Sequence, residues 1–203
     1  MPPETVPHLL YLIRHGETEW SAAGRHTGVT DVPLTANGEK QAVAVGRILT
    51  RLRDTTAVPA LVLCSPRQRA IRTAELAGLT DFQTTEQLAE WNYGEYEGRT
   101  TTDIQREVPG WTVWTHPVAG GESATEVQTR ARALLDQVRG ILNTGDVVLV
   151  GHGHFSRVLI TTWLGMTASD GVRFALEPAG IATLGYERGV EQLRRLNVSP
   201  LEV

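Results

Sequence analysis

The sequence predicts an α/β fold: a three-layer sandwich in which a mostly parallel sheet carries helices on both faces, with a small lid insertion. Short apolar runs alternate along the chain with longer stretches of helical periodicity. The apolar runs are nearly continuous, which is typical of strands buried on both faces. Three of these runs end in polar clusters that contain arginine or histidine.

The first strand is expected over residues 9–13, Leu-Leu-Tyr-Leu-Ile, and it passes directly into Arg14, His15, Gly16 and Glu17. Glycine lets the chain turn sharply and lets a ligand approach the backbone. Taken alone, the stretch also fits a strand followed by a polar turn. Residues 18–31, rich in glycine, threonine and charge, are expected to form a loop beside this strand end.

The central elements follow the same alternation. Thr35 is expected to cap a helix whose apolar face recurs at helical spacing from Ala42 to Leu52. A second buried strand is expected over residues 60–64, and the following Ser-Pro favours the start of a helix over residues 67–78. A short strand is expected next, over residues 82–84.

Residues 91–122 have no regular period and are rich in glycine and aromatic residues, so we expect a lid or small insertion there. Ser123 and Glu126 form a capping box that opens a helix running to about Asn143. The remaining elements are expected in this order: a buried strand over 147–150, a helix over 155–164, and two closing strands over 181–186 and 192–198.

Composition is that of an ordinary globular protein, with 41% hydrophobic and 21% charged residues among 203. This length predicts one domain spanning residues 1–203. The net charge of -4 gives no indication of a nucleic-acid or membrane partner. The single cysteine, Cys64, is expected to be a small buried side chain. The first eight residues lack the pattern of a secretion signal, so a cytoplasmic location is expected.

Polar residues at the strand ends are expected to converge, because the carboxyl ends of parallel strands meet at one edge of the sheet. Arg14 and His15 follow the first strand, Arg69 lies just beyond the second, and His152 follows the third. Glu90 opens the aromatic segment. Paired guanidinium groups match the oxygens of a phosphoryl group. The chain has no phosphate-binding glycine loop with a lysine, so side chains are expected to bind the phosphate.

Six segments in order resemble the motifs of the histidine phosphatase superfamily, in the branch that includes cofactor-dependent phosphoglycerate mutases. The first is Leu12-Ile13-Arg14-His15-Gly16-Glu17-Thr18. The others are Arg25-x-Thr27-Gly28-x-x-Asp31-x-Pro33-Leu34-Thr35-x-x-Gly38, Cys64-Ser65-Pro66-x-x-Arg69-Ala70-x-x-Thr73-Ala74, Leu88-x-Glu90-x-x-x-Gly94-x-x-x-Gly98, Gly120-Gly121-Glu122-Ser123 and Val150-Gly151-His152-Gly153.

The resemblance implies a role for each matching residue. His15 would be the nucleophile that becomes phosphohistidine, and Glu90 would be the general acid and then the base. The phosphoryl oxygens would be held by Arg14, Arg69 and His152, with further phosphate contacts from Ser21, Thr27, Gly28 and Gly153. The resemblance implies no metal and no cofactor, a small-molecule phosphomonoester as substrate, and a homodimer as a possible assembly.

The implied chemistry sets opposite demands on two groups. The His15 imidazole must be neutral, and the flanking arginines are expected to lower its pKa by like-charge repulsion. Glu90 must hold a proton, and desolvation by Trp91 and Tyr93 is expected to raise its pKa. An acid pH optimum is therefore expected. Glu95 and Glu97 are alternatives for the acid, although solvated loop carboxylates are the simpler interpretation.

Three positions depart from the family pattern. Ser21 stands where the family often has an asparagine that binds phosphate. Arg67 stands where an apolar residue is common, and it fits either a surface charge or an extra anion contact. His154 stands where a small residue is common, and His152 with His154 also fits a metal-ligand pair. Trp111 and Trp114 fit lid packing and substrate contact equally.

Hydrolysis is favoured over phosphoglycerate mutation because the segment between Glu90 and His152 is short and acidic and lacks an arginine pair. A mutase must retain a bisphosphate against water, and such a lid is poorly suited to that. The aromatic residues of the lid suggest a leaving group with an apolar or planar part. The alternatives are a cofactor-dependent phosphoglycerate mutase and a non-catalytic phosphate-binding regulatory module.

Overall fold

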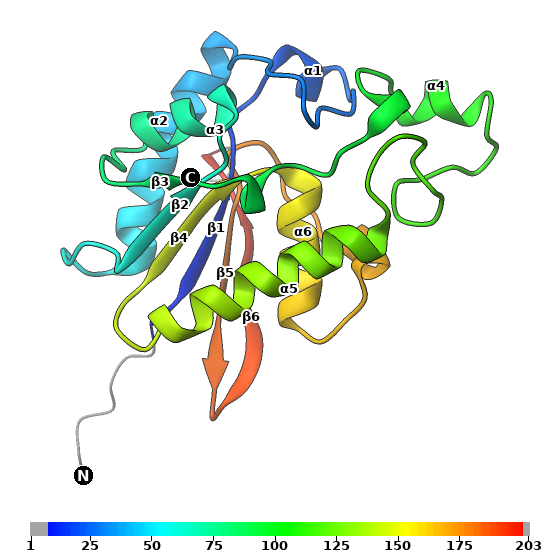
Figure 1. Cartoon of the computed structure of the whole chain (residues 1–203). Helices are drawn as coiled ribbons and strands as arrows, with labels where there is room; N and C mark the ends of the chain where they lie inside the picture. Colours follow the sequence, from blue (N-terminus) through cyan, green and yellow to red (C-terminus); the bar gives the residue numbers. More distant parts are fainter. Residues whose placement is uncertain (1–7, 201–203) are drawn as a thin grey trace.

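A single six-stranded sheet forms the centre of the protein, as the computed structural model of residues 8–200 shows (Figure 1). The strand order is β3-β2-β4-β1-β5-β6. Strands β3, β2, β4 and β1 are parallel, whereas β5 and β6 are antiparallel. The strands are β1 (Leu10–Arg14), β2 (Leu61–Cys64), β3 (Gln83–Thr84), β4 (Val147–Gly151), β5 (Ile181–Glu187) and β6 (Val190–Val198). The predicted mostly parallel sheet is thus confirmed.

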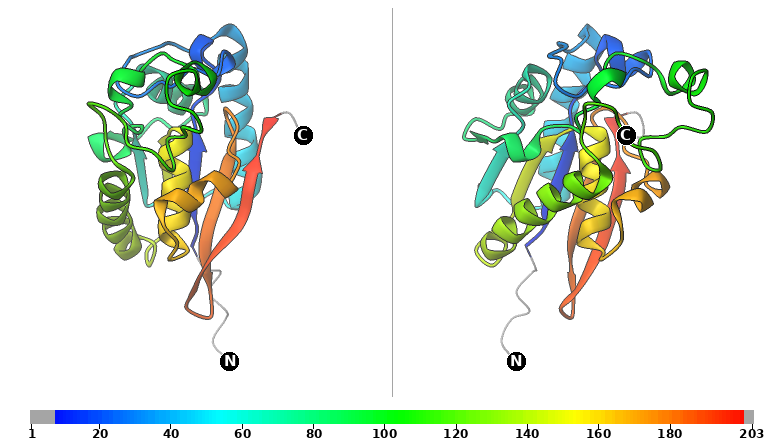
Figure 2. Two further views of the ribbon diagram at one scale, coloured as in Figure 1. Left: turned by 90° about the vertical axis from the view of Figure 1, so that its right-hand side faces the viewer. Right: turned by 45° about the vertical axis from the view of Figure 1, so that its right-hand side comes forward.

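Helices cover both faces of this sheet, which confirms the three-layer prediction (Figure 2). The pair α2 (Ala36–Arg53) and α3 (Gln68–Leu76) packs on one face, and α5 (Ala124–Ile141) and α6 (Gly153–Trp163) pack on the other. The shorter elements are α1 (Glu19–Ala22), α4 (Thr101–Gln105) and the 3-10 turns η1 (Glu86–Leu88), η2 (Gly94–Tyr96) and η3 (Ala168–Arg173).

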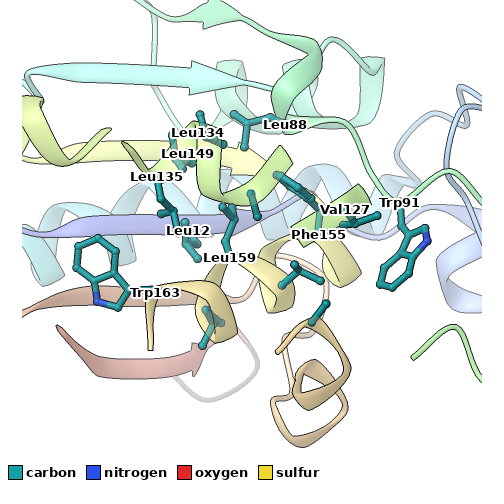
Figure 3. Close-up of a cluster of buried hydrophobic side chains, with 14 of the residues drawn as sticks. Leu12, Leu88, Trp91, Val127, Leu134, Leu135, Leu149, Phe155, Leu159 and Trp163 are labelled. Atoms are coloured by element: carbon teal, nitrogen blue, oxygen red, sulfur yellow. The ribbon is translucent and has the colours of Figure 1, made fainter. Parts of the chain in front are cut away.

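Side chains of β1 alternate between two separate apolar cores, as the geometry of a strand requires. Leu10 and Leu12 pack toward α5 and α6, while Tyr11 and Ile13 pack toward α2 and α3. Figure 3 shows Leu12 in the larger core with side chains from both covering helices. Burial on both faces explains the continuous apolar runs in the sequence.

Both predicted helix caps are present. The Thr35 side chain accepts a hydrogen bond from the amide of Gly38, and Ser123 and Glu126 form a reciprocal capping box. The sequence shows no signal for α1, α4 or η3, because elements of four to six residues carry too little periodicity. Residues 18–31, expected to be a loop, contain α1, and Thr18 caps that helix by accepting from the amide of Ser21.

Residues 91–122 lie beyond the carboxyl ends of the parallel strands, and their middle part extends to the side of the sheet (Figure 1). Apart from η2 and α4 they are irregular, as predicted. Residues 1–7, which hold most of the stretch lacking a secretion-signal pattern, lie outside the described range. No helix among residues 8–200 is long and apolar enough to cross a membrane.

Candidate active site

Backbone hydrogen bonds hold His15 at the carboxyl edge of the sheet. The amide of His15 donates to the carbonyl of Gly151 at 2.9 Å, which continues the pairing of β1 with β4. The carbonyl of His15 accepts from the amide of Ala179 at 3.0 Å. The residue after β1 is therefore fixed between the end of β4 and the loop that leads into β5.

Gly16 permits a close approach of two backbone segments. A Cβ atom at Gly16 would overlap the carbonyl oxygen of Gly38, and one at Gly38 would overlap the carbonyl oxygen of Glu17. The first turn of α2 therefore packs directly on the chain that follows His15. The sequence predicts that Gly16 allows a sharp turn and the approach of a ligand to the backbone. In the structure, the group that approaches Gly16 is the first turn of α2.

The His15 ring has a defined tautomer. Its Nδ1 lies 2.7 Å from the carbonyl oxygen of Gly16, which can only accept a hydrogen bond, so Nδ1 carries the hydrogen. Nε2 of the neutral ring is then free to act as a nucleophile. Burial lowers the pKa of His15 well below 6.5, and the charges of Arg69 and Arg14 lower it further. The predicted direction is confirmed, although burial outweighs the arginines.

Two arginines lie against this histidine with part of their hydrogen-bonding capacity unused. Arg14 donates to the carbonyl of Leu176 at 2.7 Å, and its guanidinium carbon lies 3.2 Å from where a Cβ of Gly153 would sit. Arg69 is fully buried and donates to the carbonyls of Thr27, Gly28 and Thr30. Among residues 8–200, neither buried Nε has a partner.

His152 is buried beside His15, with its ring centroid 5.2 Å away. Its Nε2 lies 2.7 Å from Oγ of Ser65, while its Nδ1 has no partner within the described chain. When the Ser65 hydroxyl donates to Nε2, the hydrogen of the neutral ring stays on Nδ1. This nitrogen, together with Nε of Arg14 and Arg69, supplies buried donors without acceptors, which is the property of an oxyanion site.

Glu90 is held by three backbone amides. Oε1 accepts from Trp91 and Phe155, both at 2.8 Å, and Oε2 accepts from His154 at 3.0 Å. Two of these amides are free donors of the first turn of α6. Burial raises the pKa of Glu90, and the three amides reduce this rise. The direction agrees with the need for a protonated acid.

A cavity of about 210 Å³ opens onto these groups. Arg14, His15, Glu90 and Gly153 line it, together with the predicted phosphate contacts Ser21 and Thr27. Arg69 and His152 are fully buried and lie behind the lining rather than in it.

The other predicted contacts are engaged within the protein. The hydroxyls of Ser21 and Thr27 donate to the carbonyls of Thr18 and Arg25. Gly28 does not line the cavity: its amide donates to Glu97, and its carbonyl accepts from Arg69. These hydrogen bonds place Thr27 and Gly28 as supports of the Arg69 guanidinium.

The structure also gives partners to the residues that depart from the family pattern. Arg67 pairs with Glu86 at 3.3 Å, at the surface. Nδ1 of His154 lies 2.6 Å from the Tyr93 hydroxyl, so His154 and His152 have different partners. No group of three or more His, Cys, Asp or Glu side chains within residues 8–200 is arranged to hold a metal ion.

Trp111 and Trp114 are buried and do not line the cavity, which favours lid packing over substrate contact for these two residues. Their indoles pack the segment internally, with Trp114 perpendicular to Trp91. Tyr93 is the aromatic residue of the segment that does line the cavity. The sequence analysis assigned no function to Ser65 or Arg157. Arg157 had a usable signal: it follows Gly153 by four residues, one turn along the same helix face.

Both arginines of residues 91–122 that the sequence singled out are neutralised locally. Arg99 pairs with Glu107 at 2.6 Å, and Arg106 pairs with Asp103 at 2.8 Å. Neither lines the cavity. The segment therefore offers no free cation of its own to a substrate at His15.

Known proteins resemble this chain along most of its length. The model of the histidine phosphatase superfamily (branch 1) matches residues 10–199. An acid phosphatase of Mycobacterium tuberculosis is 46% identical over 95% of this chain and 93% of its own length. A probable phosphoglycerate mutase GpmB of Salmonella paratyphi C is 32% identical over 88% of this chain and 85% of its own length. The solved structure of an open reading frame from Mycobacterium tuberculosis superposes with a TM-score of 0.90 at 46% identity, covering 95% of this chain and 98% of that one.

Proposed function

Because this chain belongs to the histidine phosphatase superfamily and is a phosphomonoester hydrolase of that family, we propose that it works through a phosphohistidine on His15. The observation that carries the proposal is the 2.7 Å contact between Nδ1 of His15 and the carbonyl of Gly16. This contact leaves the Nε2 lone pair available, at a buried nitrogen whose pKa is well below 6.5. Nε2 is therefore an unprotonated nucleophile at neutral and mildly acid pH.

In the first step, Nε2 of His15 attacks phosphorus and the ester P–O bond breaks. Glu90 gives its proton to the departing oxygen, which leaves as an alcohol. The charge on the three equatorial oxygens is met by the unpartnered donors of Arg14, Arg69 and His152. These groups are held by the surrounding carbonyls and by Ser65 before any substrate binds.

In the second step, water attacks the phosphohistidine and the P–N bond breaks. The Glu90 carboxylate takes a proton from the water, and inorganic phosphate leaves. The raised pKa of Glu90 suits it to hold a proton in one step and to recover it in the next. We propose that the arginines supply the positive charge and that the reaction needs no metal.

Hydrolysis rather than phosphoryl transfer to a second substrate is supported by the charge of residues 91–122. Arg99 and Arg106 are paired with carboxylates and lie outside the cavity. A bisphosphate intermediate would find no free cation on this segment to retain it. A phosphoglycerate mutase, the activity named for one relative, is the alternative outcome of the test.

Phosphate release from a panel of phosphomonoesters, with chelator present and from pH 4 to 9, tests the proposal. We expect release by the wild type, loss in His15→Ala, and full activity in His116→Ala, a histidine outside the cavity lining. Interconversion of phosphoglycerates without net release would show a mutase. Phosphate binding without turnover of any ester would show a non-catalytic module.

Two properties of the whole protein belong to the same proposal. A cytoplasmic location is supported by the single, buried, free Cys64, which gives the chain no internal disulfide of the kind common in secreted proteins. A homodimer rests on the family resemblance alone. Cell fractionation tests the location. Light scattering tests the assembly, where a mass of 22.2 kDa would contradict the dimer.

A further inference from the structure

Arg157 lines the same cavity as His15 and Glu90, yet the proposed mechanism gives it no task. It lies on α6, one helical turn after Gly153, which packs on the Arg14 guanidinium. Side chains on a helix lean toward its N-terminus, so Arg157 points back toward the strand edge. Its guanidinium therefore borders the space next to the phosphoryl position.

The guanidinium of Arg157 is held in one orientation by two contacts. Its Nε donates to the carbonyl of Gly171 at 2.8 Å, and its central carbon lies 4.5 Å from the ring centroid of Trp114. Trp114 is itself fixed, because its ring packs so closely on Gly171 that a Cβ there would overlap it. Arg157 is thus clamped before any ligand binds, which reduces the entropy lost on binding.

Arg157 also lacks a carboxylate partner anywhere in residues 8–200. The half-buried arginines elsewhere are paired: Arg53 with Asp146, Arg130 with Glu122, and Arg139 with Asp136. Partly buried charges normally have such a partner. Nothing in the described chain accepts from the two terminal nitrogens of Arg157, and the cavity is the space beside them.

Among residues 8–200, the only other cation in the cavity lining besides Arg14 and Arg157 is Arg25, whose side chain is exposed to solvent. The two histidines and the tyrosine of the lining that remain are neutral. Burial lowers the pKa of His26 to about 4 and that of His154 well below 6.5. Tyr93 is bound to His154, and burial keeps its phenol protonated by raising its pKa. Apart from the phosphate-binding groups, Arg157 is thus the half-buried cation of this lining, whereas Arg25 is solvated.

We infer that Arg157 binds a second anionic group, a carboxylate or a second phosphate, carried on the leaving group of the substrate. The inference rests on the proposed function, because it assumes that the phosphoryl group sits at His15. It makes Arg157 a specificity residue rather than a catalytic one. A planar guanidinium matches both oxyanions through paired N–H donors.

Matched substrates test this assignment. The pair 3-phosphoglycerate and glycerol 3-phosphate differs by a carboxylate, and the pair fructose 1,6-bisphosphate and fructose 6-phosphate differs by a second phosphate. We expect Arg157→Gln to lower the kcat/KM ratio of anionic to neutral ester by about 10-fold or more, chiefly through KM. Arg157→Lys should keep part of the ratio. The pair that responds shows which oxyanion is bound.

Arg139→Gln is the matched control, because Arg139 also stacks on a tryptophan, Trp163 at 5.4 Å, but lies outside the cavity. The kcat/KM ratios of anionic to neutral ester for Arg139→Gln should equal those of the wild type. If Arg157→Gln reduces both members of each pair equally, Arg157 only fastens α6 to Gly171 and the inference is wrong.

Calorimetric binding of the same pairs to His15→Ala separates this inference from the proposed function. A preference for the anionic ester that Arg157→Gln removes supports the subsite even when no ester is hydrolysed. Equal binding of the paired esters overturns it even when hydrolysis is rapid.

Discussion

Each buried histidine in the cavity lining or directly behind it has one ring nitrogen engaged by a specific neighbour. His15 contacts the carbonyl of Gly16, His152 the hydroxyl of Ser65, His154 that of Tyr93 and His26 that of Thr101. Burial keeps all four neutral, so each ring carries a single hydrogen. The carbonyl of Gly16 can only accept, which places the hydrogen of His15 on Nδ1, whereas a hydroxyl neighbour can either donate or accept. The same side chain can therefore serve as nucleophile in one place and as hydrogen-bond donor in another.

Ser65→Ala tests this control of the tautomer. Without the hydroxyl, the hydrogen of His152 is free to move to Nε2, and Nδ1 then no longer donates to the phosphoryl group. We expect kcat/KM to fall about 5- to 10-fold, the effect of one lost hydrogen bond, with the fold intact by circular dichroism. Ser156→Ala, a buried hydroxyl outside the cavity lining, is the control. Equal activity of the two variants would show that Ser65 does not orient His152.

For single residues, the sequence was a better guide to which side chains lie close together than to the hydrogen-bond partner of each one. Arg14, His15, Glu90 and Gly153 line one cavity, with Arg69 and His152 directly behind it, because strand ends meet at one edge. The contacts of Ser65 and Arg157 depend on side-chain packing between segments far apart in the chain. No local pattern encodes such contacts.

The site joins two elements: the end of β1 supplies Arg14 and His15, and the first turn of α6 supplies the amides that hold Glu90. Gly153 is the point of contact between them, since Arg14 packs on its Cα. The spacing of this strand and this helix therefore sets the distance between His15 and Glu90, the proposed nucleophile and the proposed acid.

Gly153→Ala should disturb activity more than stability. The added Cβ would lie 3.2 Å from the Arg14 guanidinium and would push it by a few tenths of an ångström. We expect kcat/KM to fall about 10-fold or more, because misplacement of a binding group is costly, while the melting temperature changes little. Gly140→Ala in α5, where nothing lies within 4 Å, should leave activity unchanged and stabilise by about 0.5–1 kcal/mol. Full activity of Gly153→Ala would contradict this account.

Helices and strands with a strong hydrophobic period or a capping residue could be predicted from the sequence, whereas helices of four to six residues could not. The helices that begin at Thr35 and Ser123 have the predicted caps. In residues 91–122 the sequence showed that aromatic residues are present but could not show that Trp111 and Trp114 face inward. Their burial depends on how that segment folds on α6 and η3, which involves contacts with residues distant in sequence.

Acidity acts on the molecule in two opposing ways. The lowered pKa of His15 and the raised pKa of Glu90 favour neutral His15 with protonated Glu90 at acid pH, which is the protonation state that the proposed mechanism requires. The same burial makes the fold sensitive to acid. A histidine that is neutral when folded takes up a proton more readily when unfolded, so stability is lost as pH falls.

His26 gives this effect a defined window. Its pKa falls from 6.5 to about 4 on folding, so its contribution is complete above pH 6.5 and is lost as pH falls toward 4. Within that window the loss is at most about 1.4 kcal/mol per pH unit for this one group. Urea unfolding at a series of pH values should show a shallower slope for His26→Asn than for the wild type. Identical slopes would contradict the assignment.

The central claim is that catalysis proceeds through a phosphoryl group on Nε2 of His15, and trapping that intermediate tests it most directly. Glu90→Gln should react once with p-nitrophenyl phosphate, whose leaving group needs no proton, and then stall because no base activates water. We predict a burst of one nitrophenolate per site and an acid-labile, alkali-stable phosphate on the peptide containing His15, absent when His15 is also changed to Ala. Phosphate on another residue, or continued turnover by the His15→Ala variant, would contradict the account.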